Sequence, residues 1–207
     1  MENARRPIRA RSVVVLQKFA AWLARTSVTP NQISVFSVVC AAAAGAALAF
    51  AQSPWCYLLA ALGIQGRLLC NVIDGLVAVE GHKKSALGAL YNEFPDRIAD
   101  SLIIVGAGYA AGMPWLGWLG ALLAALTAYV RTFGASLGLP ADFRGPMAKQ
   151  HRMAVLTAGC LVAAANFACF GPASALTVAL GIVAAGSALT CWTRTAAIAR
   201  NLNNPSD

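Results

Sequence analysis

The sequence predicts an all-α integral membrane protein with six transmembrane helices preceded by an N-terminal amphipathic interfacial helix. Of its 207 residues, 58% are hydrophobic and only 12% are charged, and the mean hydropathy is +0.63. Soluble domains carry about 25% charged residues, roughly twice this share. In addition, the connections between the apolar stretches alternate between those with Lys and Arg and those without, which is typical of a multi-pass membrane protein.

Residues 1–30 are expected to form a cytoplasmic N-terminal segment that contains the amphipathic helix. Between residues 11 and 25, apolar side chains recur three or four positions apart, and basic side chains occupy other faces. Such a helix lies in the membrane interface, where its basic surface favours anionic headgroups. A plain anchor set by positive charge explains the same pattern. The segment is too basic for a cleavable signal peptide, so we expect it to be retained.

Six stretches bounded by Pro, Gly and charged residues can each supply the roughly 20 apolar residues that cross a bilayer. They run over residues 31–52, 55–80, 86–112, 115–138, 152–170 and 174–196. We expect residues 31–200 to form one six-helix transmembrane domain, followed by a cytoplasmic tail over residues 201–207.

The connections between these spans give the orientation. The turns AQSPW, GMPW and FGPAS contain no Lys or Arg, whereas basic residues occupy the N-terminal segment, the other two connections and the C-terminal end. The positive-inside rule therefore places both termini in the cytoplasm. Since topology accounts for the net charge of +8, and no aromatic residues interleave with the basic ones, we expect no nucleic-acid partner. The six cysteines lack C-x-x-C spacing and are expected to be buried small side chains.

Five of the eight carboxylates lie within residues 71–100. Polar residues form one stripe in the second span and recur every fourth residue in the third, so each set shares a helix face: Arg67, Asn71 and Asp74, then Gly88, Asn92, Asp96 and Asp100. An ionised carboxylate inside a bilayer faces a cavity, pairs with a cation, or marks a functional site. Asp and Asn oxygens converging from two helices would suit Mg²⁺ or Mn²⁺, with phosphates completing the coordination.

Two other interpretations of these acids stay open. In one, Arg67 and Arg97 neutralise them as structural ion pairs. Gly75 and Gly88 argue against it, because glycine inside a helix is better explained by close backbone or ligand approach, and so does Pro95, which loosens the helix beside the acids. In the other, the protein is a small transporter or proton relay. That reading predicts acids spread along a crossing path, yet here they gather toward the cytoplasmic ends of two spans.

Residues 71–96 resemble the signature of the CDP-alcohol phosphotransferases, integral membrane enzymes of phospholipid synthesis. That signature reads D-x2-D-G-x2-A-R-x8-G-x3-D-x3-D, and the chain reads N-VI-D-G-LV-A-V-EGHKKSAL-G-ALY-N-EFP-D with the same spacing. The segments VTPNQIS, YVRTFGASLG and RGPMAKQHR also look similar to family segments. The matched positions are Asp74, Gly75, Ala78, Gly88 and Asp96, whereas Asn71, Val79 and Asn92 depart from the signature.

The resemblance implies a phosphatidyltransferase that moves the phosphatidyl group of CDP-diacylglycerol to an acceptor alcohol and releases CMP. It implies Mg²⁺ or Mn²⁺ held by Asp74 and Asp96, with Asn71 and Asn92 contributing neutral oxygens, and Asp96 as the base. Gly75, Ala78 and Gly88 would then lie at substrate-binding positions. Because two negative charges are lost, one metal ion, or weaker binding completed by nucleotide phosphates, is favoured over a full two-metal site.

Because Val79 replaces the signature arginine, other basic residues are candidates for binding phosphate. Arg67 is either a phosphate ligand or a partner of Asp74, and Asp100 is either a stand-in base or an ion-pair group. Arg131 and Arg152 are expected to bind an acceptor that carries its own phosphate, such as glycerol phosphate or inositol phosphate. A degenerate member that binds CDP-lipid without catalysis is a further alternative. The family also implies a homodimer in a bacterial-type inner membrane, with the active site facing the cytoplasm.

Overall fold

The computed structural model describes residues 14–81, 83, 86–168 and 173–203. Within these residues the secondary structure is entirely helical, which confirms the all-α class. The helices are α1 (Val14–Ala24), α2 (Pro30–Ala49), α3 (Pro54–Glu80), α4 (Gly88–Ala110), α5 (Pro114–Ser136), α6 (Lys149–Ala165) and α7 (Ala173–Asn203).

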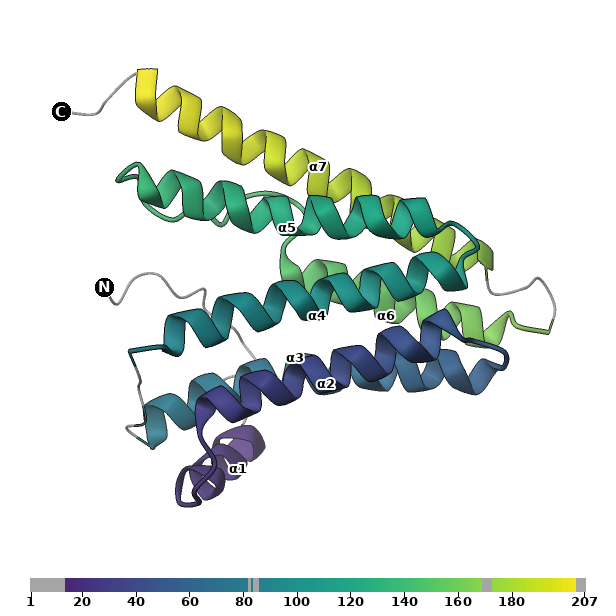
Figure 1. Ribbon diagram of the computed structural model, residues 1–207, viewed down its shortest axis with the longest axis horizontal. Helices are drawn as coiled ribbons and strands as arrows, with labels where there is room; N and C mark the ends of the chain where they lie inside the picture. Colours follow the sequence, from purple (N-terminus) through teal and green to yellow (C-terminus); the bar gives the residue numbers. More distant parts are fainter. Residues whose placement is uncertain (1–13, 82, 84–85, 169–172, 204–207) are drawn as a thin grey trace.

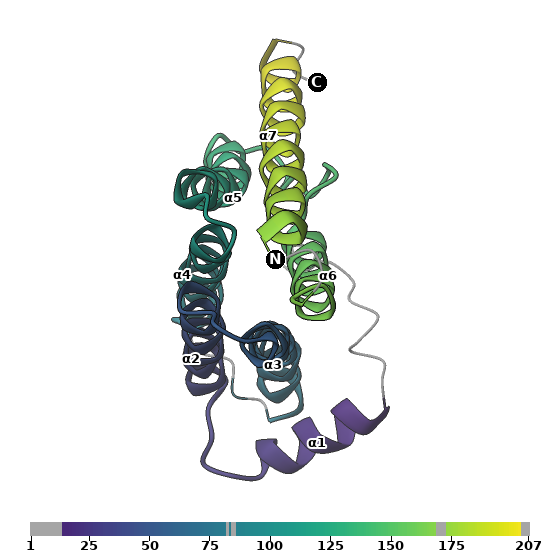
Figure 2. The same ribbon diagram turned by 90° about the vertical axis from the view of Figure 1, so that its right-hand side faces the viewer.

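Six of the helices form a closed ring, and α1 lies outside it against α3 (Figures 1 and 2). Around the ring the order of packing is α2, α4, α5, α7, α6 and α3, after which α3 returns to α2. Neighbours in the chain are therefore not always neighbours in the ring: α3 and α4 follow each other in sequence but touch only slightly. Side chains of α3 and α4 that bond to each other must therefore reach across the interior of the ring.

Helix starts follow local sequence signals. The hydroxyl of Thr29 accepts from the backbone N–H of Gln32, and the Gln32 side chain accepts from the Thr29 N–H, which completes a capping box at the start of α2. Proline opens α2, α3 and α5, where the missing N–H has no helical partner to lose.

Glycines let α4 approach both of its ring neighbours. A Cβ added to Gly106 would lie 2.8 Å from the Cα of Gly45 on α2, and one added to Gly108 would lie 2.7 Å from the Cα of Gly117 on α5. Such small-residue contacts are typical of helices packed within a membrane. They fix α4, which carries most of the acids, between α2 and α5.

A helix is present where the amphipathic helix was expected, as α1, whereas its position in the membrane interface stays a prediction. Its Ala20 is buried, and Leu16 and Leu23 pack against an apolar cluster of α3. Phe19 and Trp22 stack with their ring centroids 5.8 Å apart and are largely exposed. Residues 1–13, and with them most of the basic N-terminal segment, lie outside the described residues.

The structure supports an all-α membrane protein, whereas the presence of six membrane spans stays a prediction. Four helices, α2, α3, α5 and α7, are long and apolar enough to cross a membrane. The acids of α4 and the 17-residue length of α6 separate these two helices from the others. The expectation that Gly88 lies inside a helix is wrong, because α4 begins at this residue. The cost of a glycine in a helix interior therefore does not arise here.

Candidate functional site

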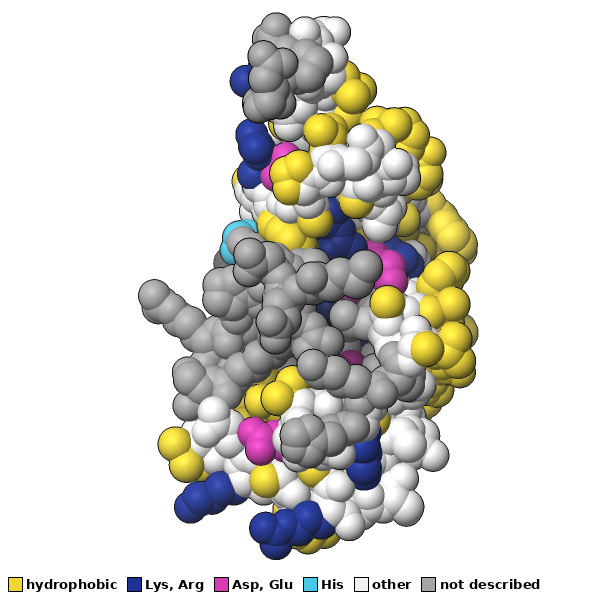
Figure 3. Space-filling model, turned by 90° about the vertical axis from the view of Figure 1, so that its left-hand side faces the viewer, with side chains coloured by type: hydrophobic (Ala, Val, Ile, Leu, Met, Phe, Trp, Pro, Cys, Tyr) yellow, Lys and Arg dark blue, Asp and Glu magenta, His cyan; other side chains and the backbone are white. Residues whose placement is uncertain are grey.

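Charged side chains gather at the end of the bundle where α3 ends and α4 begins. Figure 3 looks onto this end and shows Lys, Arg, Asp and Glu side chains there, whereas the flank at the right of the picture is mostly apolar. A charged end beside an apolar flank is the distribution expected of a membrane protein whose polar site opens near one surface.

Asp96 is the centre of the site, because three helices converge on its carboxylate. Its Oδ1 accepts from Nδ2 of Asn71 at 3.1 Å and from Nη2 of Arg67 at 3.3 Å, both from α3. Its Oδ2 accepts from Nζ of Lys149, the first residue of α6, at 2.5 Å. Nη2 of Arg97 lies 3.8 Å from the same Oδ2. Asp96 is only 7% exposed, so these donors account for most of its surroundings.

Asp74 has different partners. The Oγ of Ser34, on α2, donates to Asp74 Oδ2 over 2.6 Å. Asp74 also lies within electrostatic range of Asp96 and Lys149. The structure thus brings Asp74 to the same site as Asp96 and Asn71, but holds it with a neutral hydroxyl group. Its carboxylate is the less compensated of the two.

Asp100 lies one turn deeper and belongs to an ion-pair network. Its Oδ1 accepts from Nη2 of Arg67 at 2.5 Å, and its Oδ2 accepts from Nη2 of Arg152 at 2.8 Å. Asp100 is 2% exposed, and both arginines are fully or almost fully buried. Asp100 is therefore an ion-pair group in this structure, as one of the two alternatives expected.

Arg67 bridges Asp96 and Asp100, and the alternative that paired it with Asp74 is wrong. The reason is register: Arg67 points across the interior toward α4, whereas Asp74, seven residues later on α3, bonds to α2. Two donor nitrogens of Arg67, Nε and Nη1, have no hydrogen-bond partner among the described residues. A buried arginine with unpaired donors is unusual and is a candidate for contact with an anionic ligand.

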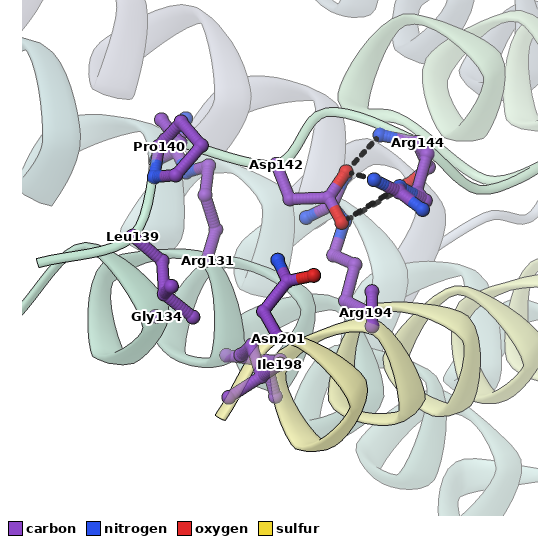
Figure 4. Close-up of a pocket in the computed structure, with 12 residues that line it drawn as sticks. Arg131, Gly134, Leu139, Pro140, Asp142, Arg144, Arg194, Ile198 and Asn201 are labelled. Carbon is purple, nitrogen blue, oxygen red and sulfur yellow. Dashed lines mark hydrogen bonds and ion pairs between the residues drawn. The ribbon is translucent and has the colours of Figure 1, made fainter. Parts of the chain in front are cut away.

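A second feature is an arginine-lined cavity between α5, the connection after it, and α7. Its volume is about 110 Å³, and Figure 4 shows the side chains around it. The polar residues among those that line it are Arg131, Asp142, Arg144, Arg194 and Asn201. Three guanidinium groups against one carboxylate give this cavity a positive charge.

Of the two acceptor-side arginines expected from the sequence, one lines this cavity. Arg131 does so, and its Nη2 also donates to Glu93 Oε2 of α4 at 2.7 Å. Arg152 instead pairs with Asp100 and donates from Nη1 to the carbonyl of Met147 at 2.9 Å. The cavity and the acidic site are thus joined through α4, by Glu93 on one side and Asp96 on the other.

The remaining residues predicted for the site lie along α3 and at the start of α4. Gly75 and Ala78 are half-buried on α3, next to Asp74 and one turn after it. Gly88 opens α4, and Asn92, one turn before Asp96, is exposed. Asn92 is therefore on the acidic stripe of α4 but at its more accessible end.

The oxygen donors present fit one hard divalent cation. Two carboxylates, Asp74 and Asp96, share the site with the amide of Asn71, and such oxygens suit Mg²⁺ or Mn²⁺ when phosphate oxygens complete the shell. Within the described ranges, however, no three His, Cys, Asp or Glu side chains are grouped as a metal site. A cation here would depend on a phosphate ligand for much of its coordination.

Two residues of this site were not singled out from the sequence. Ser34 lies in the segment VTPNQIS, but nothing in its local pattern says that it faces Asp74 across α2 and α3. Lys149 was one of several basic residues in a connection where topology alone explains positive charge. Its contact with Asp96 crosses the interior of the ring from α6 to α4, two helices that touch only slightly.

Comparisons with known proteins agree with this arrangement. The family model described as CDP-alcohol phosphatidyltransferase matches residues 27–200. Archaetidylinositol phosphate synthase of Aeropyrum pernix is 36% identical over 140 residues, which are 67% of this chain and 70% of that protein. Phosphatidylinositol phosphate synthase of Streptomyces avermitilis is 28% identical over 198 residues, or 90% of this chain and 78% of that protein.

Solved structures share the fold. A crystal structure of Mycobacterium tuberculosis phosphatidylinositol phosphate synthase with CDP-DAG bound has a TM-score of 0.73 at 20% identity, covering 89% of this chain and 93% of that one. A structure of the same enzyme in complex with manganese and citrate has a TM-score of 0.73 at 21% identity, covering 88% of both chains.

Proposed function

The chain belongs to the CDP-alcohol phosphatidyltransferase family, and we propose that it moves the phosphatidyl group of CDP-diacylglycerol to an alcohol that carries its own phosphate. The observation that carries this proposal is the pairing of the acidic site with the arginine-lined cavity. Glu93 links them, since it lies on α4 three residues before Asp96 and pairs with Arg131 of the cavity at 2.7 Å. One helix thus separates a site for the pyrophosphate from a site for an anionic acceptor.

In the proposed reaction the acceptor hydroxyl oxygen attacks the β-phosphorus, which bears diacylglycerol. A new P–O bond forms, the bond from that phosphorus to the bridging oxygen breaks, and CMP leaves with the bridging oxygen. The hydroxyl proton passes to Asp96. A carboxylate offers about four acceptor positions, and Asn71, Arg67 and Lys149 use three of them. The fourth, on Oδ2, is open to the hydroxyl group, and the ion would take over a position from one of these three donors when it binds.

A divalent ion, Mg²⁺ or Mn²⁺, would be held by Asp74 and Asp96, with the amide oxygens of Asn71 and Asn92. Its chemistry would be that of a Lewis acid, which offsets charge on the pyrophosphate and on the leaving CMP. The manganese complex of the mycobacterial enzyme supports this assignment. The oxygen of Asn71 would have to face the ion while its Nδ2 keeps its bond to Asp96, an arrangement that one amide can satisfy.

Arg67 is proposed to bind a substrate phosphate as well as to hold the acids. Its Nη2 is used by Asp96 and Asp100, and its Nε and Nη1 remain without a protein partner. This arginine would take over the role of the signature arginine, which is Val79 here. Gly75, Ala78 and Gly88 would allow the nucleotide to approach the helix backbones closely.

The acceptor is proposed to be a phosphate-bearing polyol, with inositol phosphate first among the candidates. Three guanidinium groups around a cavity of about 110 Å³ would bind a phosphate group through charge-assisted hydrogen bonds. The names of the archaeal and Streptomyces relatives, both inositol phosphate lipid synthases, support this choice. Arg152 would act on the reaction through Asp100, as a positioning residue.

We also propose that α2 to α7 all cross the membrane, with both termini cytoplasmic, so that residues 31–200 form the catalytic domain. At about 1.5 Å per residue, the 23 residues of α4 span about 35 Å and the 17 residues of α6 about 26 Å, close to the hydrocarbon thickness of about 30 Å. A homodimer, in which exposed apolar faces meet, is part of the same proposal.

The test is CMP release by the purified protein in liposomes with CDP-diacylglycerol and Mg²⁺ or Mn²⁺. Acceptors to compare are inositol phosphate, glycerol 3-phosphate, serine and free inositol. We expect release with a phosphate-bearing acceptor and its loss in the Asp96→Asn protein. No release with any acceptor, while CDP-diacylglycerol still binds, would favour the non-catalytic alternative.

A further inference from the structure

We propose that Lys149 is an internal cation of the acidic site, so that the protein binds a single divalent ion per chain together with its substrate. In this arrangement the ammonium group of Lys149 supplies positive charge at Asp96 that a second metal ion would otherwise supply. The inference rests on the proposed function, because it concerns the ion that would accompany the CDP-diacylglycerol pyrophosphate.

The first support is that Lys149 occupies a ligand position. Its Nζ lies 2.5 Å from Asp96 Oδ2, at the distance of a strong charge-assisted hydrogen bond. On the other oxygen of Asp96, two hydrogen-bond donors, Arg67 and Asn71, are already present. Asp96 therefore has little capacity left to bridge two metal ions, although one ion can still share it with Asp74.

The second support is that Lys149 is delivered by a fixed backbone. Just before it, the backbone N–H of Met147 donates to Thr190 Oγ1 on α7 at 3.0 Å. Gly145 adopts a φ of +114°, and a Cβ there would lie 2.6 Å from Thr190 Cγ2, so the connection is pressed against α7 at a point that only glycine accommodates. Arg194 Nε holds the carbonyl of Arg144 at 2.9 Å. Lys149 thus begins α6 from an anchored turn.

The third support is the charge balance of the buried cluster. Three carboxylates face three cations before any metal enters: Asp74, Asp96 and Asp100 against Arg67, Lys149 and Arg152. A fourth cation near Asp96, Arg97, is balanced by its pair with Glu93. The pyrophosphate of CDP-diacylglycerol brings one negative charge on each phosphate, and one divalent ion neutralises it. A second divalent ion would leave two positive charges uncompensated in a poorly solvated site, which is strongly unfavourable.

Binding of Mn²⁺ to the purified, full-length protein tests this directly. Free Mn²⁺ is measured by electron paramagnetic resonance during titration in detergent micelles that contain CDP-diacylglycerol, and binding to protein-free micelles is subtracted. We expect the wild-type protein to saturate at one Mn²⁺ per chain. Two ions per chain, or none, would overturn the inference.

Two variants separate the role of Lys149 from a general effect of charge. Lys149→Met should tighten Mn²⁺ binding about tenfold or more, since a positive charge next to the ion is removed at low effective dielectric constant. Arg97→Met also removes a charge near Asp96 Oδ2, but Nη2 of Arg97 lies 3.8 Å from this oxygen, farther than Nζ of Lys149. This substitution should change the affinity for Mn²⁺ by less than about threefold. Unchanged or weaker binding in Lys149→Met would contradict the proposal.

A double variant gives a spectroscopic check. Asn71→Asp combined with Lys149→Met restores one negative charge and removes the ammonium group, so we expect a second Mn²⁺ and the loss of isolated-ion signal through spin coupling. CMP release is measured on the same preparations. Release with two ions in the wild-type protein would sink only this inference, whereas one bound ion without release from any acceptor would leave it standing and count against the proposed function.

Discussion

Ser34 of α2 donates a hydrogen bond to Asp74 of α3, with 2.6 Å between Ser34 Oγ and Asp74 Oδ2. Both residues are largely buried. Among the described residues, Asp74 is the acid of the cluster that pairs with no arginine, so this hydroxyl group fixes the carboxylate that is freest to bind a cation. The contact makes Ser34 a positioning residue for the proposed metal site.

Replacing Ser34 with alanine should therefore weaken Mn²⁺ binding. Hydrogen bonds to charged groups contribute about 1.5–3 kcal/mol, so we expect the Mn²⁺ dissociation constant to rise by roughly ten- to a hundredfold, measured by the same titration. Ser37→Ala is the matched control, because its hydroxyl is equally buried but donates to the carbonyl of Ser34 at 2.6 Å. Equal effects of the two substitutions would show that Ser34 acts only through general stability.

The Asp100–Arg152 pair predicts a different signature. Arg152→Met should lower the free energy of unfolding by about 3 kcal/mol, because losing one partner leaves a buried carboxylate with less compensation. Asp100→Asn in the same chain should recover much of this loss. Unfolding in mixed micelles compares both variants with the wild-type protein.

If Arg152 were instead a direct ligand of the acceptor, the outcome would differ. Arg152→Met would then raise the acceptor KM with little loss in the free energy of unfolding. Adding Asp100→Asn would restore neither the acceptor KM nor the stability. The structure favours the ion pair, since Arg152 is 1% exposed and does not line the arginine-rich cavity.

The sequence predicted the local features of this protein well. The stripes on α3 and α4 followed from helical spacing alone. Asn71 bonds to Asp96, and Asp74 lies within electrostatic range of Asp96. What it did not predict depends on how separate helices pack. Arg67 pairs with Asp96 and Asp100, and not with Asp74, because the register between α3 and α4 is set by the whole ring.

Distance along the chain hid the other contacts. Lys149 lies 53 residues from Asp96, and Ser34 lies 40 residues from Asp74, so no local periodicity links either pair. The positive charge around the connection between α5 and α6 was explained by membrane topology. For this reason the sequence did not indicate that Lys149 and Arg152 each neutralise a particular acid. Gly88, expected inside a helix, is the first residue of α4, since Ala86 and Leu87 before it form a turn.

The close crossing of α2 and α4 predicts a large effect from one methyl group. Gly106→Ala would place Cβ 2.8 Å from the Cα of Gly45, so the helices must separate. Overpacking of this kind costs about 1–3 kcal/mol, and the thermal midpoint in detergent should fall by several degrees. Gly181→Ala, where a Cβ meets nothing within 4 Å on α7, should leave the midpoint unchanged or raise it. A similar fall in both variants would show that the crossing is not the cause.

The arginine-lined cavity predicts a selective loss of acceptor binding. Arg131→Met removes one of the three guanidinium groups, and the loss of charge-assisted hydrogen bonds worth about 1.5–3 kcal/mol should raise the KM for a phosphate-bearing acceptor by roughly ten- to a hundredfold. The KM for CDP-diacylglycerol should stay the same, because its phosphates are proposed to lie at Arg67. Arg131→Lys should recover part of the loss, since charge remains while the planar fork is gone.

Arg200→Met is the control for this prediction, because Arg200 lies near the end of α7 and, within the part of the chain that the structure describes, donates only to the carbonyl of Ala196 in its own helix. It lowers the net charge of the protein by the same amount without touching the cavity. Steady-state CMP release with each substrate varied in turn provides both constants. If Arg131→Met lowered kcat at saturating acceptor and left the acceptor KM unchanged, Arg131 would serve the reaction through its pair with Glu93, and the phosphate of the acceptor would have to be bound elsewhere.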